Sequence, residues 1–154
     1  MNRPLCFVLM PRGRKPDPDG ALVDFDVVYH NLIAPAVHSA GLEPLRSVQD
    51  FSEDFYLKPL FEQFILCPFA VVDLTLAGAN LYYELGARHA KRPGTTVAVY
   101  ADNEKTPLHR LTLDAVAYSL AGDGTLTNLV PPREILTGAL EKARRTLKES
   151  PFSD

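Results

Sequence analysis

The sequence predicts one α/β domain in which a mainly parallel sheet lies between two layers of helices. Short apolar runs alternate along the chain with segments whose apolar residues recur at helical spacing, the pattern of βαβ units. The runs lack polar alternation, which indicates strands buried on both faces. At 154 residues the chain has the size of a single domain with a substantial core. We therefore expect a single-domain, three-layer Rossmann- or flavodoxin-like fold with five strands in the order 2-1-3-4-5.

The first half of the chain predicts three of these strands and the first two helices. Residues 5–10 form an apolar run that ends at Pro11, as expected for a buried strand. A polar loop rich in proline and glycine follows at 11–20. A helix begins at Asp24 and ends at Gly41, a residue type that commonly terminates helices. The next elements are a strand at 42–48, a helix at 52–66 that Pro59 kinks or starts, and a strand at 69–74.

The second half predicts the remaining two strands and two helices. Asn80 is expected to cap a helix at 80–91, and two threonines open a strand at 95–100. The other elements are a polar connection at 102–113, a short edge strand at 115–120, a loop at 122–132, a helix at 133–148 that follows two prolines, and a frayed tail at 149–154. Residues 1–154 are thus expected to form one domain without internal repeats.

Composition argues against several classes of function. The formal net charge of −3 gives no electrostatic footprint for nucleic acid or an anionic membrane. No segment approaches the ~18 consecutive apolar residues of a membrane span. Cys6 and Cys67 lie in apolar runs without metal-ligand spacing, so we expect two buried free thiols in a reducing compartment. With no secretory signal before the first strand, we expect a cytoplasmic protein without a metal site, cofactor, nucleic-acid partner or membrane association.

Two carboxylates, Asp73 and Glu84, are the main candidates for chemistry. Asp73 ends the third apolar run, and Glu84 lies in the first turns of the helix that follows. In a sheet of the expected order, the loops after the first and third strands meet where open α/β folds bind ligands. There Glu84 suits a nucleophile or a stabiliser of an oxocarbenium ion, and Asp73 suits binding a ribose hydroxyl or protonating a leaving base. The alternatives are a surface ion pair between Glu84 and Arg88 and a loop-ordering role for Asp73.

The loop after the first strand and the helix behind it supply candidate ligand contacts. Three cations flank a flexible glycine in this loop, an arrangement suited to a phosphate but also typical of a solvated basic loop. These residues are Arg12, Gly13, Arg14 and Lys15. Asp26 and Tyr29 lie one turn apart at the start of the first helix, where Asp26 suits a sugar hydroxyl and Tyr29 suits positioning of the substrate. An acid at a helix start also satisfies free backbone amides, which is the alternative for Asp26.

Several strings of residues recur in this order in a known family. They are Cys6-Phe-Val-Leu-Met-Pro11, Asp24-Phe-Asp26-Val-Val-Tyr29, Ala70-Val-Val-Asp73-Leu-Thr75 and Asn80-Leu-Tyr-Tyr83-Glu84-Leu-Gly86-Ala-Arg88-His89-Ala90. On these strings the chain resembles the deoxyribosyltransferase-like domain of ASK-type MAP kinase kinase kinases and its stand-alone bacterial relatives. It is more distantly similar to nucleoside 2-deoxyribosyltransferases and deoxynucleoside 5′-monophosphate N-glycosidases. The chain departs from the ASK-like pattern at Pro11-Arg12-Gly13, where Pro-Phe-Gly is usual, after the second strand, and at Gly78-Ala-Asn80.

The resemblance implies an enzyme that cleaves the N-glycosidic bond of a nucleoside or nucleotide, with Glu84 as nucleophile and Asp73 acting on the base or sugar. It implies that relatives and this chain assemble as homo-oligomers. The residues expected to contact the substrate are Met10, Pro11, Arg12, Gly13, Arg14, Asp26, Tyr29, Asn80 and Tyr83. The alternative function is a non-catalytic nucleotide-sensing or protein-interaction module of a signalling or defence system.

Overall fold

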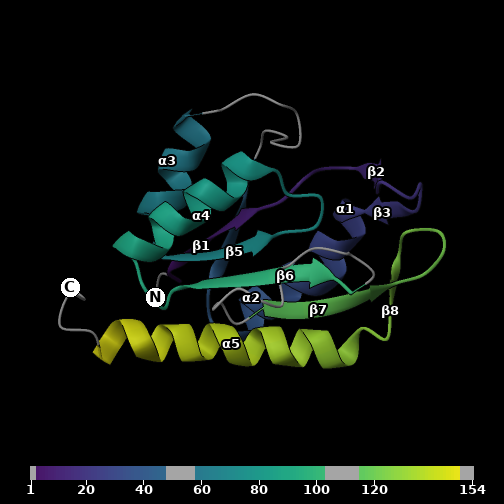
Figure 1. Ribbon diagram of the computed structural model, residues 1–154. Coiled ribbons are helices and arrows are strands. Elements are labelled where there is room, and N and C mark those ends of the chain that lie inside the picture. Colours follow the sequence, from purple (N-terminus) through teal and green to yellow (C-terminus); the bar gives the residue numbers. More distant parts are fainter. Residues whose placement is uncertain (1–2, 48–57, 103–114, 150–154) are drawn as a thin grey trace.

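The computed structural model describes residues 3–47, 58–102 and 115–149. A six-stranded sheet lies between two layers of helices, so the predicted α/β class is confirmed (Figure 1). In spatial order, the strands of the sheet are β4 (Glu43–Arg46), β1 (Leu5–Leu9), β5 (Phe69–Asp73), β6 (Thr96–Ala101), β7 (Ala115–Leu120) and β8 (Leu126–Thr127). No helix within the described ranges is long and apolar enough to cross a membrane.

The sheet is mostly parallel, but the prediction of five strands is wrong. β4, β1, β5, β6 and β7 pair in parallel, whereas β8 runs antiparallel to β7 and makes β7 an inner strand rather than the expected edge. The chain reverses in a turn where Ala121 N–H donates to the Thr125 carbonyl and Gly124 adopts a φ of 88°. β8 was missed because two residues are too few to show a periodic pattern.

The expected loop at 11–20 contains strand structure of its own. β2 (Arg14–Pro16) and β3 (Leu22–Asp24) form a small antiparallel hairpin outside the main sheet. Its turn is ordered by the Asp17 carboxylate, which accepts hydrogen bonds from the backbone N–H groups of Asp19 and Ala21. Strands this short leave no alternation in the sequence, so the loop prediction was wrong here.

The first predicted helix is divided into three segments. α1 (Phe25–Val28) is capped by Asp24, whose carboxylate accepts from Val27 N–H at 3.2 Å. A π-helical turn, η1 (Tyr29–Ile33), then leads into α2 (Ala34–Ser39). In that turn Ala34 N–H bonds to the carbonyl of Tyr29, five residues back, just before Pro35, which lacks an N–H. Apolar spacing alone cannot distinguish such a turn from continuous α-helix.

The remaining helices cover both faces of the sheet. α3 (Lys58–Leu66) and α4 (Ala79–Lys91) lie on one face, and α2 and α5 (Val130–Glu149) lie on the other (Figure 1). Pro59 stands in the first turn of the described part of α3, and residues 48–57 and 103–114, where further predicted structure falls, lie outside the described residues. Cys6 and Cys67 are buried free cysteines, as expected.

Side chains of each inner strand alternate between two apolar clusters. In β5, Phe69 and Val71 join the cluster beneath α2 and α5, while Ala70 and Val72 join the cluster beneath α3 and α4. This alternation decides on which face each polar side chain at the end of a strand lies. It therefore governs the geometry of the candidate site.

Candidate functional site

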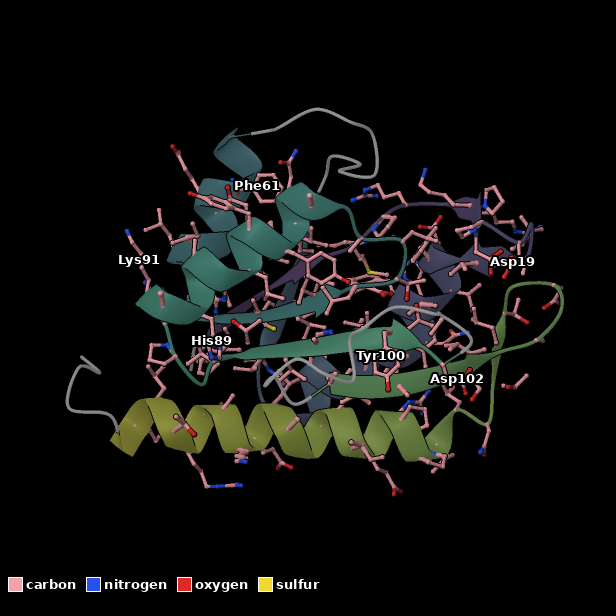
Figure 2. The ribbon with its side chains drawn as sticks, viewed as in Figure 1. Asp19, Phe61, His89, Lys91, Tyr100 and Asp102 are labelled. Carbon is pink, nitrogen blue, oxygen red and sulfur yellow. The ribbon has the colours of Figure 1, made fainter. Side chains whose placement is uncertain are left out.

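The candidate residues gather at the carboxyl edge of the sheet. Because the inner strands are parallel, the ends of β1, β4, β5 and β6 meet there, as the order of the sheet predicts. Figure 2 shows Asp102, after β6, and Asp19, in the β2–β3 hairpin, at this end of the molecule. His89 and Lys91, at the end of α4, lie at the opposite end.

Asp73 is fully buried in a hydrogen-bond network that joins three strands. Its Oδ1 accepts from Thr75 N–H at 2.9 Å, and its Oδ2 accepts from the Tyr118 hydroxyl at 2.8 Å. The Tyr118 hydroxyl also lies 3.1 Å from Thr75 Oγ1, which accepts from Ala101 N–H at 2.9 Å. The network thus ties the ends of β5, β6 and β7 together. This geometry favours the loop-ordering alternative for Asp73.

The loop that leads from Asp73 to α4 is tightly constrained. Leu76 adopts a φ of 63°, uncommon for a residue with a side chain, and Ala77 N–H donates to the Leu74 carbonyl at 3.1 Å. Gly78, not Asn80, is the N-cap of α4, and it offers no side chain to the free amides. The prediction that Asn80 caps the helix is wrong because the turn after Leu76 starts the helix earlier. Asn80 is exposed in the first turn of α4.

Glu84 lies on the buried face of α4. Only 4% of its surface is exposed, and no hydrogen bond or ion pair to its carboxylate is found within the described residues. The carboxylate oxygens are not among the fully buried polar atoms that lack a partner there. Leu81 and Leu85 flank it on the same face of the helix. Tyr83, in contrast, points away from the core with 76% of its surface exposed. The alternative of a surface ion pair between Glu84 and Arg88 is therefore wrong.

Arg88 is fully buried and binds backbone carbonyls rather than the Glu84 carboxylate. Its Nη1 donates to the carbonyls of Phe64 at 2.5 Å and Cys67 at 2.7 Å, and its Nε donates to Thr96 Oγ1 at 2.5 Å. The guanidinium thereby satisfies carbonyls at the C-terminal end of α3 that the helix itself leaves unpaired. Burial lowers the pKa of Arg88 to about 10, so it stays charged at neutral pH. Arg88 fixes α4 against α3 one turn after Glu84.

Asp73 and Glu84 belong to opposite faces of the sheet. The side chain of Asp73 lies on the same face of β5 as that of Val71. It contacts Tyr118, which packs in the cluster beneath α2 and α5. Glu84 belongs to α4, whose Leu85 packs in the cluster on the other face. The two carboxylates therefore approach the carboxyl edge from different layers rather than side by side on one face.

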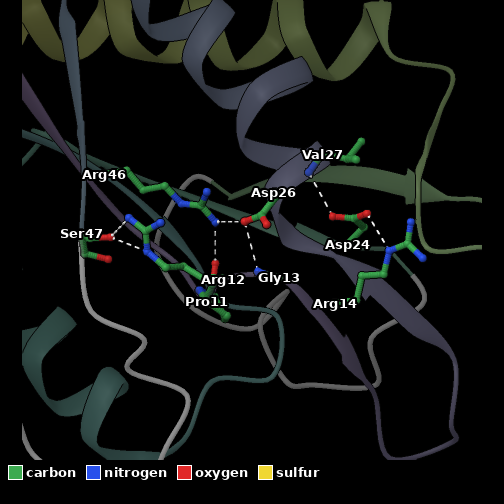
Figure 3. A network of polar contacts seen from close by, with 9 residues as sticks. All are labelled: Pro11, Arg12, Gly13, Arg14, Asp24, Asp26, Val27, Arg46 and Ser47. Atoms are coloured by element: carbon green, nitrogen blue, oxygen red, sulfur yellow. Dashed lines mark hydrogen bonds and ion pairs between the residues drawn. The ribbon is translucent and has the colours of Figure 1, made fainter.

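A second polar network lies where β1 and β4 end (Figure 3). Arg46 Nη2 donates to Asp26 Oδ1 at 2.8 Å and to the Pro11 carbonyl at 2.9 Å. Gly13 N–H donates to the same Asp26 oxygen at 3.1 Å. The Arg46 guanidinium also stacks over the Tyr29 ring, 4.8 Å from its centroid. These contacts bring Pro11, Gly13, Asp26 and Tyr29 together as predicted, around an arginine that the site prediction missed.

The cations of the predicted phosphate loop already have protein partners. Arg12 donates through Nε at 3.0 Å and Nη2 at 2.5 Å to the Ser47 carbonyl. Arg14, in β2, pairs with Asp24 at 3.1 Å (Figure 3). Met10 is fully buried in the core. The described residues thus do not form an open cradle of basic side chains after β1.

Charge states in this network have clear physical causes. The pKa of Asp26 is lowered chiefly by the hydrogen bond from Gly13 N–H and further by Arg46 and Arg12, so Asp26 is ionised at neutral pH. Partial burial raises the pKa of Tyr29, which keeps it a neutral phenol.

Sequence reasoning missed Arg46, Thr75 and Tyr118 as site residues. The sequence signal for Arg46 was a cation at the carboxyl end of a predicted strand.

Neither the known protein families nor the curated proteins include a match to this chain.

Proposed function

We propose that the protein cleaves the N-glycosidic bond of a nucleoside or nucleotide, with Glu84 as the nucleophile. The observation that carries the proposal is a nearly buried carboxylate without a partner among the described residues. Burying such a group costs free energy unless it is paired, so a purely structural role would normally supply a donor. An unpaired buried acid at the ligand-binding edge of an α/β sheet is better explained by chemistry on a ligand.

The reaction balances with this one carboxylate and water. The Glu84 carboxylate forms a bond to the anomeric carbon of the sugar while the bond from that carbon to the base nitrogen breaks. The base leaves with the electron pair of that bond and takes a proton from water. Water then hydrolyses the glycosyl ester and regenerates the carboxylate. The resemblance through Tyr83-Glu84-Leu-Gly86 supports the same assignment.

For Asp73, the hydrogen bonds favour positioning over direct contact with the base. Both of its oxygens accept from Thr75 or Tyr118, and these bonds order the loop that begins α4. In the proposed reaction Asp73 therefore holds the helix start that carries Glu84. Its direct role as an acid remains the prediction of the resemblance.

The test is base release from a panel of nucleosides, nucleoside monophosphates and NAD, followed by chromatography. Glu84→Gln keeps the size of the side chain but removes the nucleophile, so any base release should fall to the uncatalysed rate. Glu141→Gln, an exposed glutamate on α5, is the matched control and should behave as wild type. The proposal fails if wild type releases no more base than Glu84→Gln from every member of the panel.

A second candidate is a nucleotide-sensing module without turnover. It is favoured by the placement of Asp73 and Glu84 on opposite faces of the sheet, since Asp73 is then not placed to act beside the nucleophile. This function predicts that a nucleotide raises the melting temperature of the protein while no base is released. Thermal unfolding with each panel member separates the two candidates.

Assembly and location are further proposals that rest on the resemblance. We infer a cytoplasmic homo-oligomer that binds a nucleoside or nucleotide. Light scattering after size-exclusion chromatography measures the mass, and a monomer at all concentrations would contradict the assembly.

A further inference from the structure

We propose that Asp26 Oδ2 accepts a hydrogen bond from a sugar hydroxyl of the ligand, and that Arg46 is the positioning residue that fixes this carboxylate. The inference rests on the proposed function for the identity of the ligand as a nucleoside. It extends that function to a second part of the site, at the ends of β1 and β4, and gives Arg46 a role.

Two donors converge on one oxygen of Asp26 and leave the other available. Arg46 Nη2 and Gly13 N–H both donate to Oδ1, at 2.8 Å and 3.1 Å. Oδ2 has no hydrogen-bond partner among the residues that the structure describes. The side chain is 48% exposed, so a ligand can reach it from solvent. The carboxylate is therefore held in one orientation with one acceptor oxygen free (Figure 3).

The environment of Arg46 indicates that its ion pair with Asp26 fixes the orientation of the Asp26 carboxylate. Only 9% of the Arg46 side chain is exposed, and its Nε is buried without a partner among the described residues. Taking a guanidinium out of water is costly, and an ion pair with a half-exposed aspartate returns little stability. Stacking on Tyr29 and the bond to Pro11 hold the guanidinium rigidly in place. The arrangement therefore specifies geometry more than it stabilises the fold.

The backbone around Asp26 is equally well fixed. Gly13 has a φ of 73°, a conformation that favours glycine, and its carbonyl accepts from Phe25 N–H at 3.0 Å. The loop after β1 and the start of α1 are thus joined on both sides of Asp26. A binding group held by rigid elements and a supporting arginine is preorganised for a ligand.

Hydroxyl groups are the ligand chemistry that this acceptor suits. An ionised carboxylate only accepts hydrogen bonds, and bonds from neutral donors to a charged acceptor are stronger than those between neutral groups. Lowering of the Asp26 pKa by Gly13 and Arg46 keeps it in that state. A phosphate would be repelled by the free oxygen, whereas a sugar hydroxyl would be bound.

The first experiment measures nucleoside affinity by calorimetry in wild type and Asp26→Asn. In the variant the amide oxygen can still accept from Gly13 and Arg46, which directs the amide NH₂ to the position of Oδ2. Affinity for a ribonucleoside should fall about tenfold to a hundredfold. Removing both ring hydroxyls, as in a 2′,3′-dideoxynucleoside, should weaken binding to wild type but not to Asp26→Asn. Asp19→Asn, in the exposed hairpin turn, is the control and should not change affinity.

The second experiment tests the positioning role of Arg46. Arg46→Lys keeps a positive charge but loses the planar group that stacks on Tyr29 and reaches two acceptors. It should weaken hydroxyl-dependent binding about as much as Asp26→Asn, and the double variant should be no weaker than either. Arg145→Lys, at an exposed position of α5 outside the site, is the control and should leave affinity unchanged.

The outcomes separate this inference from the proposed function. If wild type releases base but Asp26→Asn binds ribo- and dideoxynucleosides as wild type does, the inference is overturned and the function stands. If binding depends on the hydroxyls and Asp26 while no base is released, the inference stands and the sensing module replaces the enzyme. Failure of every nucleoside to bind overturns the inference.

Discussion

Replacing Tyr118 by phenylalanine tests whether the buried network at Asp73 stabilises the carboxyl edge. The Tyr118 hydroxyl has one proton, and the carboxylate of Asp73 at 2.8 Å is the stronger acceptor. Thr75 Oγ1, at 3.1 Å, must then donate its own proton to Tyr118 while it accepts from Ala101 N–H. Tyr118→Phe therefore removes one hydrogen bond to a charged group and one between hydroxyls, without changing the packing of the ring.

The magnitude follows from the two bonds. A buried hydrogen bond to a carboxylate contributes about 2 kcal/mol and a neutral one about 1 kcal/mol, so the free energy of unfolding should fall by about 3 kcal/mol. For a domain of this size the melting temperature should drop by about 6–12 °C. Thr75→Val removes one of the same bonds, so the two substitutions should be less than additive, with a coupling of about 1 kcal/mol.

Urea unfolding followed by circular dichroism measures these changes. Tyr83→Phe is the matched control, because its hydroxyl is on an exposed side chain of α4, and it should shift stability by no more than about 0.5 kcal/mol. Equal stability of the two phenylalanine variants would refute the hydrogen-bond network as described. Additive effects of the Tyr118 and Thr75 substitutions would refute their mutual bond.

Three further predictions concern backbone conformation, thiol reactivity and pH. Gly124→Ala should lower the free energy of unfolding by about 2 kcal/mol, because φ is 88° and the added Cβ would lie 2.8 Å from a backbone carbonyl oxygen of β3. Gly138→Ala, inside α5 with open space around it, should raise the free energy of unfolding by up to about 1 kcal/mol. Thermal unfolding of the two variants measures both changes. Cys6 and Cys67 should react with a thiol reagent at the rate of unfolding, because burial raises the pKa of both thiols; rapid labelling of the native protein would contradict this. Since the pKa of Asp26 is lowered from its ordinary 3.8, its contribution to stability is present above that value and is lost as pH falls below it; urea midpoints in acid should fall less steeply for Asp26→Asn than for wild type.

Several features of the fold follow from local sequence alone. The apolar runs at β1 and β5 specify buried strands wherever they pack, because apart from Asp73 at the end of β5 neither contains a polar residue that could face water. The role of Asp24 at the start of the first helix is also local, since its carboxylate bonds to an amide three residues on. The position of Asp26 beside the loop after β1 could also be predicted, because the order of the strands determines where this loop and the start of the first helix lie.

Other features depend on residues that are distant in the sequence. Arg88 was expected to pair with Glu84, one turn away, but it reaches carbonyls of Phe64 and Cys67 at the end of another helix. Arg46 bonds to Asp26 and to Pro11, which precede it by 20 and 35 residues. No periodicity or spacing encodes such contacts, because they arise only once the sheet order brings the strand ends together.

The sequence by itself determined the α/β class, the mainly parallel sheet, and the placement of the candidate residues at its carboxyl edge. These depend on apolar periodicity and on helix caps, which act within a few residues. Only the tertiary structure decided that Asp73 faces Tyr118, that Glu84 lies on the buried face of α4, and that Arg46 holds Asp26. The physical reason is that the face of a strand and the partner of a buried charge are set by packing between layers. Among the described residues, Glu84 is the buried acid to which no hydrogen bond or ion pair is found, and this placement directs the search for activity.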